Sequence, residues 1–276
     1  MRAVVFAPLL LAAVALLVPP STARADALAC KPSGNAPSTT GVVLMHGALD
    51  GSGNWIASLK KKLVAAGFRL ATPEMAWSER REYDRSYQQS LDQIATEVKG
   101  LEQHGARRVV VAGHSFGANA ALGYAAMRGG VAGVAVIAPG QMPDLPALQQ
   151  IVGASVAKAR QMVAAGAGGK KDFFKDFLQW HGKLDGAYTT AANYLSYFDP
   201  TGDAVYPKNA AKLSPQIPLL WVDPAKNDND TIVVSKAYAF DKAPRNPLSR
   251  YILSPSGHLD TPAASADLVV AWLKCL

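Results

Sequence analysis

The segment VVVAGHSFGANAALGYA, residues 109–125, decides how the rest of the chain is interpreted. It begins with small apolar residues typical of a buried strand and ends in an alanine-rich stretch typical of a helix. Between them, Gly113-His114-Ser115-Phe116-Gly117 matches the pattern G-x-S-x-G. In a sharp turn from strand to helix, such glycines permit close packing and the serine hydroxyl is exposed. Ser115 is therefore predicted to be a nucleophile, and a purely structural turn is the alternative.

Apolar strand patterns alternate with helical patterns on both sides of this segment. The pattern predicts strands at residues 41–45, 68–72, 108–112, 131–138, 218–223 and 250–254, and helices at residues 55–66, 87–104, 118–127 and 263–273. Such alternation predicts an α/β fold, with a mostly parallel sheet and helices on both faces. Residues from about 140 to 215 depart from it, with helical pieces and aromatic-rich loops. They are predicted to form a cap-like insertion over the sheet.

A serine hydroxyl is a weak nucleophile at neutral pH, so a base must lie within hydrogen-bond reach. The chain has five histidines. His258 lies in SPSGHLDTP, between the last predicted strand and the last predicted helix. This place fits a chain order of serine, acid and histidine, so His258 is predicted to be the general base. A hydrogen-bonded loop histidine without a catalytic role is the alternative.

A carboxylate is expected to hold the histidine ring and to stabilise its charged form. The segment WVDPAKNDND, at the end of the strand at residues 218–223, offers Asp223, Asp228 and Asp230. Asp228 is preferred, because Asp223 lies too near the strand and Asp230 is placed to cap a helix.

Backbone amides are expected to bind the oxyanion that forms when serine attacks a carbonyl. His46-Gly47 follows the first predicted strand, and the amides of Ala48 and Phe116 are predicted to form the oxyanion hole. Each such donor contributes on the order of 3 kcal/mol. A phosphate-binding loop is the alternative for HGALDGSG, residues 46–53, but the segment lacks the lysine and the spacing of that motif.

Four segments together resemble the α/β-hydrolase family: LMHGALDGSG, AGHSFGANAAL, PLLWVDPAKND and SGHLDTP, in family order over roughly residues 41–276. The resemblance implies the α/β-hydrolase fold and a Ser-His-Asp mechanism, and leaves the substrate open. It is closest to exported bacterial members without a well-defined activity. In the usual pattern the acid stands three residues after a glycine that follows the strand. Counted from Pro224, that spacing falls on Asn227, so Asp228 requires a shift by one residue.

The predicted function is hydrolysis of a small acyl substrate, above all a carboxylic ester, through an acyl-enzyme. Amide or thioester hydrolysis would use the same residues. A non-catalytic binding protein on the same scaffold is the alternative of a different class, because fold alone does not fix activity. No metal or other cofactor is expected, and the sequence leaves the oligomeric state open.

Aromatic residues of the insertion have two interpretations: they line an acyl pocket, or they are the core of the insertion. The set is Phe173, Phe174, Trp180, Tyr188, Tyr194 and Tyr197. Trp77 and the pair Arg80-Arg81 precede the long helix at residues 87–104 and are candidates for substrate contact.

The N-terminal segment, residues 1–25, is predicted to be a secretory signal peptide. Arg2 precedes an apolar run, and the small-residue triplet Ala23-Arg24-Ala25 precedes a cleavage site before Asp26. The apolar run is shorter than the ~20 residues of a membrane-spanning helix. We therefore expect residues 26–276 to form an exported hydrolase domain, periplasmic or secreted, without stable membrane insertion. An uncleaved anchor and a lipid-modified Cys30 are the alternatives.

The remaining global features concern cysteine and charge. Cys30 and Cys275 are the only cysteines and lie near the ends of the exported chain, so a disulfide between them is predicted. Unpaired surface thiols are the alternative. The net charge of +7 is scattered in small clusters, which does not favour a nucleic-acid partner.

Overall fold

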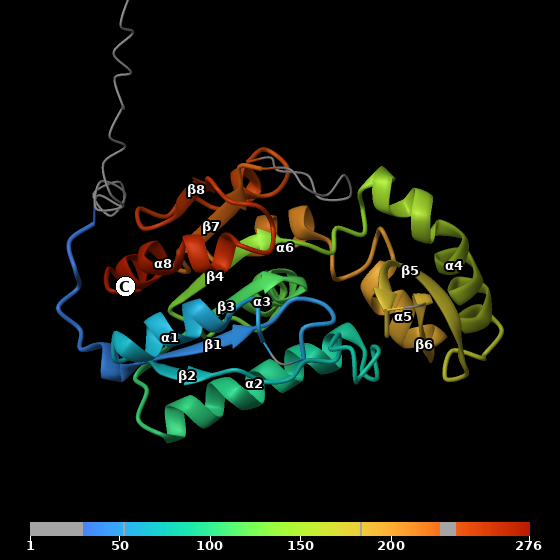
Figure 1. The fold of residues 1–276 in the computed structure, drawn as a ribbon, viewed down its shortest axis with the longest axis horizontal. Coiled ribbons are helices and arrows are strands. Elements are labelled where there is room, and N and C mark those ends of the chain that lie inside the picture. Colours follow the sequence, from blue (N-terminus) through green and yellow to red (C-terminus); the bar gives the residue numbers. More distant parts are fainter. Residues whose placement is uncertain (1–29, 52, 183, 227–235) are drawn as a thin grey trace, which may run out of the picture.

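Six parallel strands form the main sheet of the computed structural model, which describes residues 30–276 except 52, 183 and 227–235 (Figure 1). The strand order is β2-β1-β3-β4-β7-β8, and each neighbouring pair is parallel. Their bounds are β1 Thr40–Met45, β2 Arg69–Ala71, β3 Arg108–Ser115, β4 Gly133–Pro139, β7 Leu219–Pro224 and β8 Arg250–Ser254. The carboxyl ends of all six strands therefore lie along one edge of the sheet.

Alternate residues of the strands are buried on opposite faces of this sheet. On β1, Val43 and Met45 belong to one apolar cluster, and Val42 and Leu44 belong to the other. This follows from the two-residue period of a strand. Both faces are covered, so the central strands are apolar throughout, as in the predicted buried runs.

Helices cover each face. Residues of α1 (Ala57–Ala65) and α8 (Ala266–Leu273) pack on one side. Residues of α2 (Tyr87–Gln103), α3 (Phe116–Met127) and α6 (Tyr206–Lys212) pack on the other. The predicted α/β fold, a mostly parallel sheet with helices on both faces, is confirmed. No helix in the described part of the chain is long and apolar enough to cross a membrane.

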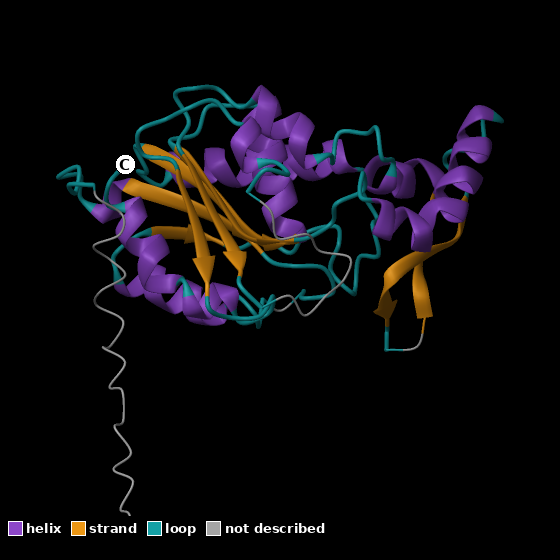
Figure 2. Cartoon of the chain, turned by 90° about the horizontal axis from the view of Figure 1, so that it is seen from above, coloured by secondary structure: helices purple, strands orange, loops and turns teal. Residues whose placement is uncertain are grey.

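The insertion lies between β4 and β7, beside the main sheet. It contains α4 (Pro146–Ala164), β5 (Lys171–Trp180), β6 (Leu184–Thr190) and α5 (Ala191–Phe198), and α6 leads from it to β7. Strands β5 and β6 form a separate antiparallel hairpin (Figures 1 and 2).

The segment DFFKDFLQW, residues 172–180, lies in a strand and not in the predicted loop. Cross-strand pairing explains the difference. Phe174 pairs with Ala187 on the buried face, while Phe173 pairs with Tyr188 on the exposed face. Aromatic residues stabilise such cross-strand pairs, and the pattern of one strand alone does not show its partner.

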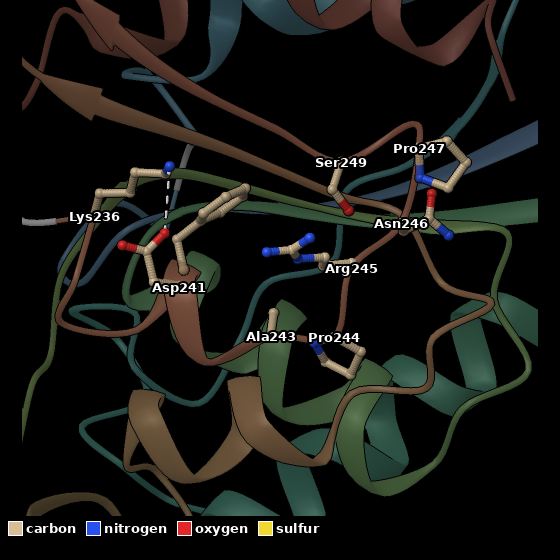
Figure 3. Close-up of a pocket in the computed structure, with 9 residues that line it drawn as sticks. Lys236, Asp241, Ala243, Pro244, Arg245, Asn246, Pro247 and Ser249 are labelled. Carbon is tan, nitrogen blue, oxygen red and sulfur yellow. Dashed lines mark ion pairs between the residues drawn. The ribbon is translucent and has the colours of Figure 1, made fainter.

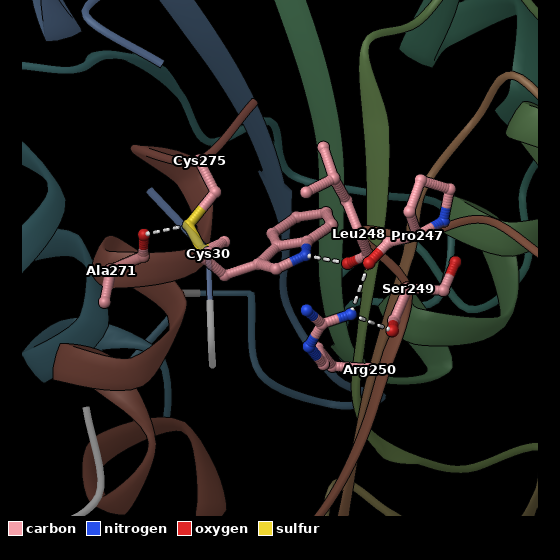
Figure 4. The surroundings of a disulfide bond; sticks show 8 residues. Cys30, Pro247, Leu248, Ser249, Arg250, Ala271 and Cys275 are labelled. Atoms are coloured by element: carbon pink, nitrogen blue, oxygen red, sulfur yellow. Dashed lines mark hydrogen bonds between the residues drawn. A yellow bond between two sulfur atoms is a disulfide. The ribbon is translucent and has the colours of Figure 1, made fainter. Parts of the chain in front are cut away.

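The predicted disulfide joins Cys30 to Cys275, with their Cα atoms 5.9 Å apart (Figure 4). It ties the start of the described chain to the residues just after α8. The Ser33 amide also donates a hydrogen bond to the Lys274 carbonyl at 2.8 Å. The two ends of the described chain therefore lie side by side.

Reducing this disulfide is expected to destabilise the protein by up to about 5 kcal/mol, because a cross-link over so long a loop restricts the unfolded chain. Urea unfolding with and without reductant measures the difference. A variant carrying both Cys30→Ser and Cys275→Ser is the control, and it should match the reduced wild type and ignore reductant. Equal stability of oxidised and reduced wild type would contradict the expectation.

Candidate active site

Ser115 stands at the junction of β3 and α3, in a conformation that few side chains adopt. Its φ is 55° and its ψ is −116°. A positive φ costs energy for any residue with a Cβ, and such strain is concentrated at functional sites. The residue is half-buried, at the carboxyl edge of the sheet. This is the geometry of a nucleophile elbow, in which the hydroxyl is held away from both strand and helix.

The two glycines of the motif make this turn possible. A Cβ on Gly113 would lie 2.1 Å from the backbone of Gly117. A Cβ on Gly117 would lie 2.5 Å from the Met45 carbonyl oxygen. Helix α3 therefore packs directly against β3 and β1, and no side chain fits between them.

His258 is the partner that the structure brings to Ser115. Its Nε2 lies 3.0 Å from Ser115 Oγ, although 143 residues separate the two positions. The histidine follows β8 and precedes α7 (Thr261–Ala264), and only 9% of its surface is exposed. Thr261 shapes this loop from within, because its hydroxyl donates to the Gly257 carbonyl at 2.7 Å. A hydroxyl and an imidazole at this distance can exchange a proton.

Of the three candidate acids, Asp228 and Asp230 lie outside the described residues. Asp223 is described and lies within β7. Its Oδ1 accepts a hydrogen bond from Trp221 Nε1 at 2.7 Å, and its Oδ2 accepts one from the Tyr251 hydroxyl at 2.6 Å. Burial raises the pKa of the Asp223 carboxyl, and these two hydrogen bonds oppose that shift. Asp223 is thus held by its aromatic neighbours.

The loop of Ala48 and the first residue of α3, Phe116, both lie next to Ser115. A Cβ on Gly47, next to Ala48, would lie 3.2 Å from Ser115 Cβ. Ala48 and Phe116 are both buried. The loop of one predicted oxyanion-hole residue, Ala48, therefore lies beside the serine, and the other residue, Phe116, directly follows it in the chain.

A model of the alpha/beta hydrolase family matches residues 42–272 of the sequence. The chain belongs to the alpha/beta hydrolase family. The match spans Ser115, His258 and the loop of Ala48. A comparison with curated proteins finds no matching sequence.

Solved structures similar to this hydrolase include lipolytic enzymes from several sources. One match comes from the metagenome-derived lipolytic enzymes LipS and LipT, at 15% identity and a TM-score of 0.58, covering 86% of this chain and 92% of that one. A monoacylglycerol lipase from Paleococcus ferrophilus has 16% identity and a TM-score of 0.57, covering 87% and 96%. A thermostable carboxyl esterase from Bacillus coagulans has 14% identity and a TM-score of 0.58, covering 85% and 88%. At such identities the likeness shows the fold.

In this hydrolase His46 has a structural role. The Met75 amide donates to its Nε2 at 2.9 Å, so the ring proton is on Nδ1, which donates to the Gly47 carbonyl at 2.6 Å. Burial lowers the pKa of His46, which keeps it neutral. Trp77 Nε1 donates to the His46 carbonyl at 2.9 Å. Hydrogen bonds to His46 thus hold the loop at residues 73–83 against the end of β1.

Trp77 and the arginine pair have other partners in the structure than the predicted substrate, although Arg80 itself is exposed. Trp77 is completely buried, stacked on Phe116 with ring centroids 5.5 Å apart. Arg80 pairs with Glu74, and Arg81 pairs with Asp84. Packing on α3 accounts for Trp77, and ion pairs with neighbouring carboxylates account for the two arginines.

The insertion aromatics are divided between core and surface. Phe174, Tyr194 and Tyr197 are completely buried. Tyr194 stacks on Phe174 at 4.7 Å, and Tyr197 lies 5.9 Å from the Phe116 ring. They are core residues, and Tyr197 joins the insertion to α3, which starts at Phe116. Phe173 and Tyr188 are exposed on the hairpin. The Trp180 side chain is not among the parts of the chain that the structure describes.

Gly140, which follows β4, is a site residue that the sequence analysis did not identify. A Cβ at this position would lie 2.5 Å from Ser115 Oγ. The Tyr206 hydroxyl donates to the Gly140 carbonyl at 3.0 Å, which fixes the backbone beside the serine. In the sequence, Pro139-Gly140 indicates only the end of a strand. The contact between Gly140 and Ser115 is seen only in the folded structure.

Gly140→Ala is expected to lower turnover by at least about a hundredfold, because the added methyl must displace Ser115 Oγ from His258, and a displacement of about 1 Å can cost that much. Rates on an acyl ester test this, with Gly153→Ala as the control. Gly153 lies within α4, and a Cβ there meets only the end of the Gln149 side chain, at 3.8 Å. A Gly140→Ala enzyme as fast as the control would contradict the placement of Gly140.

A hollow of about 660 Å³ lies elsewhere, along the connection from β7 to β8 (Figure 3). Its described lining runs from Lys236 to Ser249 and includes neither Ser115 nor His258. Within the described residues, no group of three or more His, Cys, Asp or Glu side chains is placed to hold a metal ion.

Proposed function

We propose that this chain is a carboxylic-ester hydrolase with Ser115 as nucleophile and His258 as general base. The observation that carries the proposal is the 3.0 Å distance from His258 Nε2 to the oxygen of a strained serine. Family membership and a fold shared with lipases and esterases support hydrolysis in general. Specificity for esters and the roles of Ser115 and His258 are proposed here.

The proposed reaction has two halves. Ser115 Oγ attacks the acyl carbonyl carbon while His258 Nε2 takes the hydroxyl proton, and the amides of Ala48 and Phe116 stabilise the oxyanion. His258 then gives its proton to the departing alkoxide, which leaves as an alcohol. Water attacks the acyl-enzyme with His258 again as base, so a carboxylic acid is released and Ser115 regains its proton.

The acid that orients His258 is proposed to be Asp228. Asp223 is the weaker candidate, because both of its oxygens already accept hydrogen bonds from Trp221 and Tyr251. Asp230 is the remaining alternative in the same segment.

Comparison of Asp223→Asn, Asp228→Asn and Asp230→Asn tests this assignment. The true acid should lose about ten-thousandfold in kcat, since asparagine keeps the volume but removes the charge that stabilises imidazolium. Asp223→Asn should instead show reduced stability with a smaller loss of kcat. Full activity of Asp228→Asn with collapse of another variant would reassign the acid, and activity in all three would exclude this segment.

The proposed activity is tested with a panel of acyl esters of increasing chain length, together with matched amides and thioesters. Hydrolysis of at least one ester, with esters faster than the matched amides, is expected. Ser115→Ala protein is the matched control for background hydrolysis. Absence of turnover across the panel would favour a binding protein on the same scaffold.

Export is part of the proposal. Residues 1–25 are proposed to direct the chain out of the cytoplasm, to a periplasmic or secreted location. Protein recovered from the producing cell's envelope or medium should begin at Asp26 when its N-terminus is sequenced. Lipid on Cys30 would contradict both this location and the disulfide.

A further inference from the structure

His114 is a completely buried imidazole that the proposed reaction does not use. It precedes Ser115 on β3 and pairs with Ile137 of β4. Its Nε2 lies 3.1 Å from the carbonyl oxygen of His258. A carbonyl oxygen only accepts hydrogen bonds, so Nε2 carries the ring proton and donates it. The nucleophile strand is thereby bonded to the main chain of the general base.

The ring is held in one protonation state. The pKa of His114 is lowered to about 3, chiefly by burial and also by the nearby His258, while the hydrogen bond to the His258 carbonyl opposes the shift. A neutral imidazole with its proton on Nε2 has a bare Nδ1, and this atom has no hydrogen-bond partner among the described residues. An unpaired buried nitrogen is costly, and such atoms call for an explanation.

The position of the ring supplies that explanation. A Cβ on Gly47 would lie 3.1 Å from His114 Nδ1, so this side of the ring abuts the loop of the proposed oxyanion hole. On another side, its centroid lies 5.1 Å from that of His258, and Trp55 makes an edge contact at 6.2 Å. One rigid side chain therefore contacts both loops that must meet at Ser115.

We propose that His114 is a positioning residue, whose hydrogen bond to the His258 carbonyl sets the distance from His258 Nε2 to Ser115 Oγ. This role rests on the proposed function, because it has meaning only if His258 acts on Ser115. The bonds from Thr261 to the Gly257 carbonyl shape the same loop from within. The bond from His114 anchors that loop to the strand that holds the nucleophile.

Two variants of similar shape separate the hydrogen bond from the packing. In His114→Gln, an amide donor can take the place of Nε2, whereas His114→Met fills similar space without a donor. His114→Met is expected to lose about a hundredfold in kcat with little change in KM, as for a catalytic group displaced by about 1 Å. His114→Gln should recover at least about tenfold of that loss. Equal kcat values for the two variants would overturn the proposal.

A cycle with His258→Ala distinguishes positioning from a general loss of structure. If His114 acts through His258, His114→Met should not slow the His258→Ala enzyme further, because the group that it positions is already absent. A further loss equal to that seen in the wild-type background would overturn the proposal. Thermal unfolding of each variant shows whether it is folded.

Nitrogen-15 NMR of the wild-type histidines tests the geometry without any substituted protein. Between about pH 6 and pH 8, His114 should remain the neutral tautomer protonated on Nε2, and the tautomer protonated on Nδ1 would overturn the proposal. If this tautomer is found but the wild type hydrolyses no acyl substrate, the proposed function fails and the positioning role fails with it. If the wild type is active and His114→Met matches it, only the positioning role fails.

Discussion

Ser115→Ala is expected to lower ester hydrolysis by at least about a thousandfold, because the variant has no oxygen with which to form the acyl-enzyme. The thermal midpoint should change little, since the lost atom is half-buried at the edge of the sheet and contributes little to packing. Initial rates and thermal unfolding of the two proteins provide the measurement.

Ser214→Ala is a suitable control for this experiment. Ser214 precedes β7, at the opposite edge of the parallel sheet, and its hydroxyl bonds the side chain of Gln216. This variant should keep the wild-type rate. If Ser115→Ala retained more than about a thousandth of the wild-type rate, Ser115 would not be the nucleophile.

His258→Ala is expected to be nearly as damaging as Ser115→Ala, because the serine would have no base to take its proton. His104→Ala is the matched control. His104 is an exposed histidine at the end of α2, where its Nδ1 bonds the Gly100 carbonyl at 2.7 Å. The comparison of kcat for the three proteins separates loss of the base from loss of any imidazole.

The combination of both changes tests whether serine and histidine act as one unit. Losses within such a unit do not add, so the double variant should be about as slow as either single variant. A double variant slower than each single variant by a further large factor would show that the two residues contribute independently, contrary to the proposed pairing.

The strand-turn-helix around Ser115 could be predicted from sequence because its causes are local. Gly113 and Gly117 are required by contacts under 3 Å within a few residues or with the adjacent strand. The buried strands were equally clear, since both faces of a parallel sheet are covered. The place of His258 followed from chain order, and the distance to Ser115 Oγ required the fold.

The features missed in the sequence depend on contacts between separate segments of the chain. Hairpin β5-β6 is stabilised by cross-strand pairs such as Phe174 with Ala187. Trp77 was a candidate for substrate contact, but it is buried on Phe116 and donates a hydrogen bond to the His46 carbonyl. The role of Gly140 depends on its contact with Ser115, and the role of His114 depends on its hydrogen bond to His258. Local patterns contain no signal for such contacts.

Labelling with a fluorophosphonate probe, followed by peptide mapping, tests the central claim most directly, because the probe reacts with serines that a base activates. The wild type is expected to carry one label, on the peptide that contains Ser115. Label should be absent from Ser115→Ala and should form far more slowly in His258→Ala. No label on folded wild-type protein, or a label that persists in Ser115→Ala, would contradict the account.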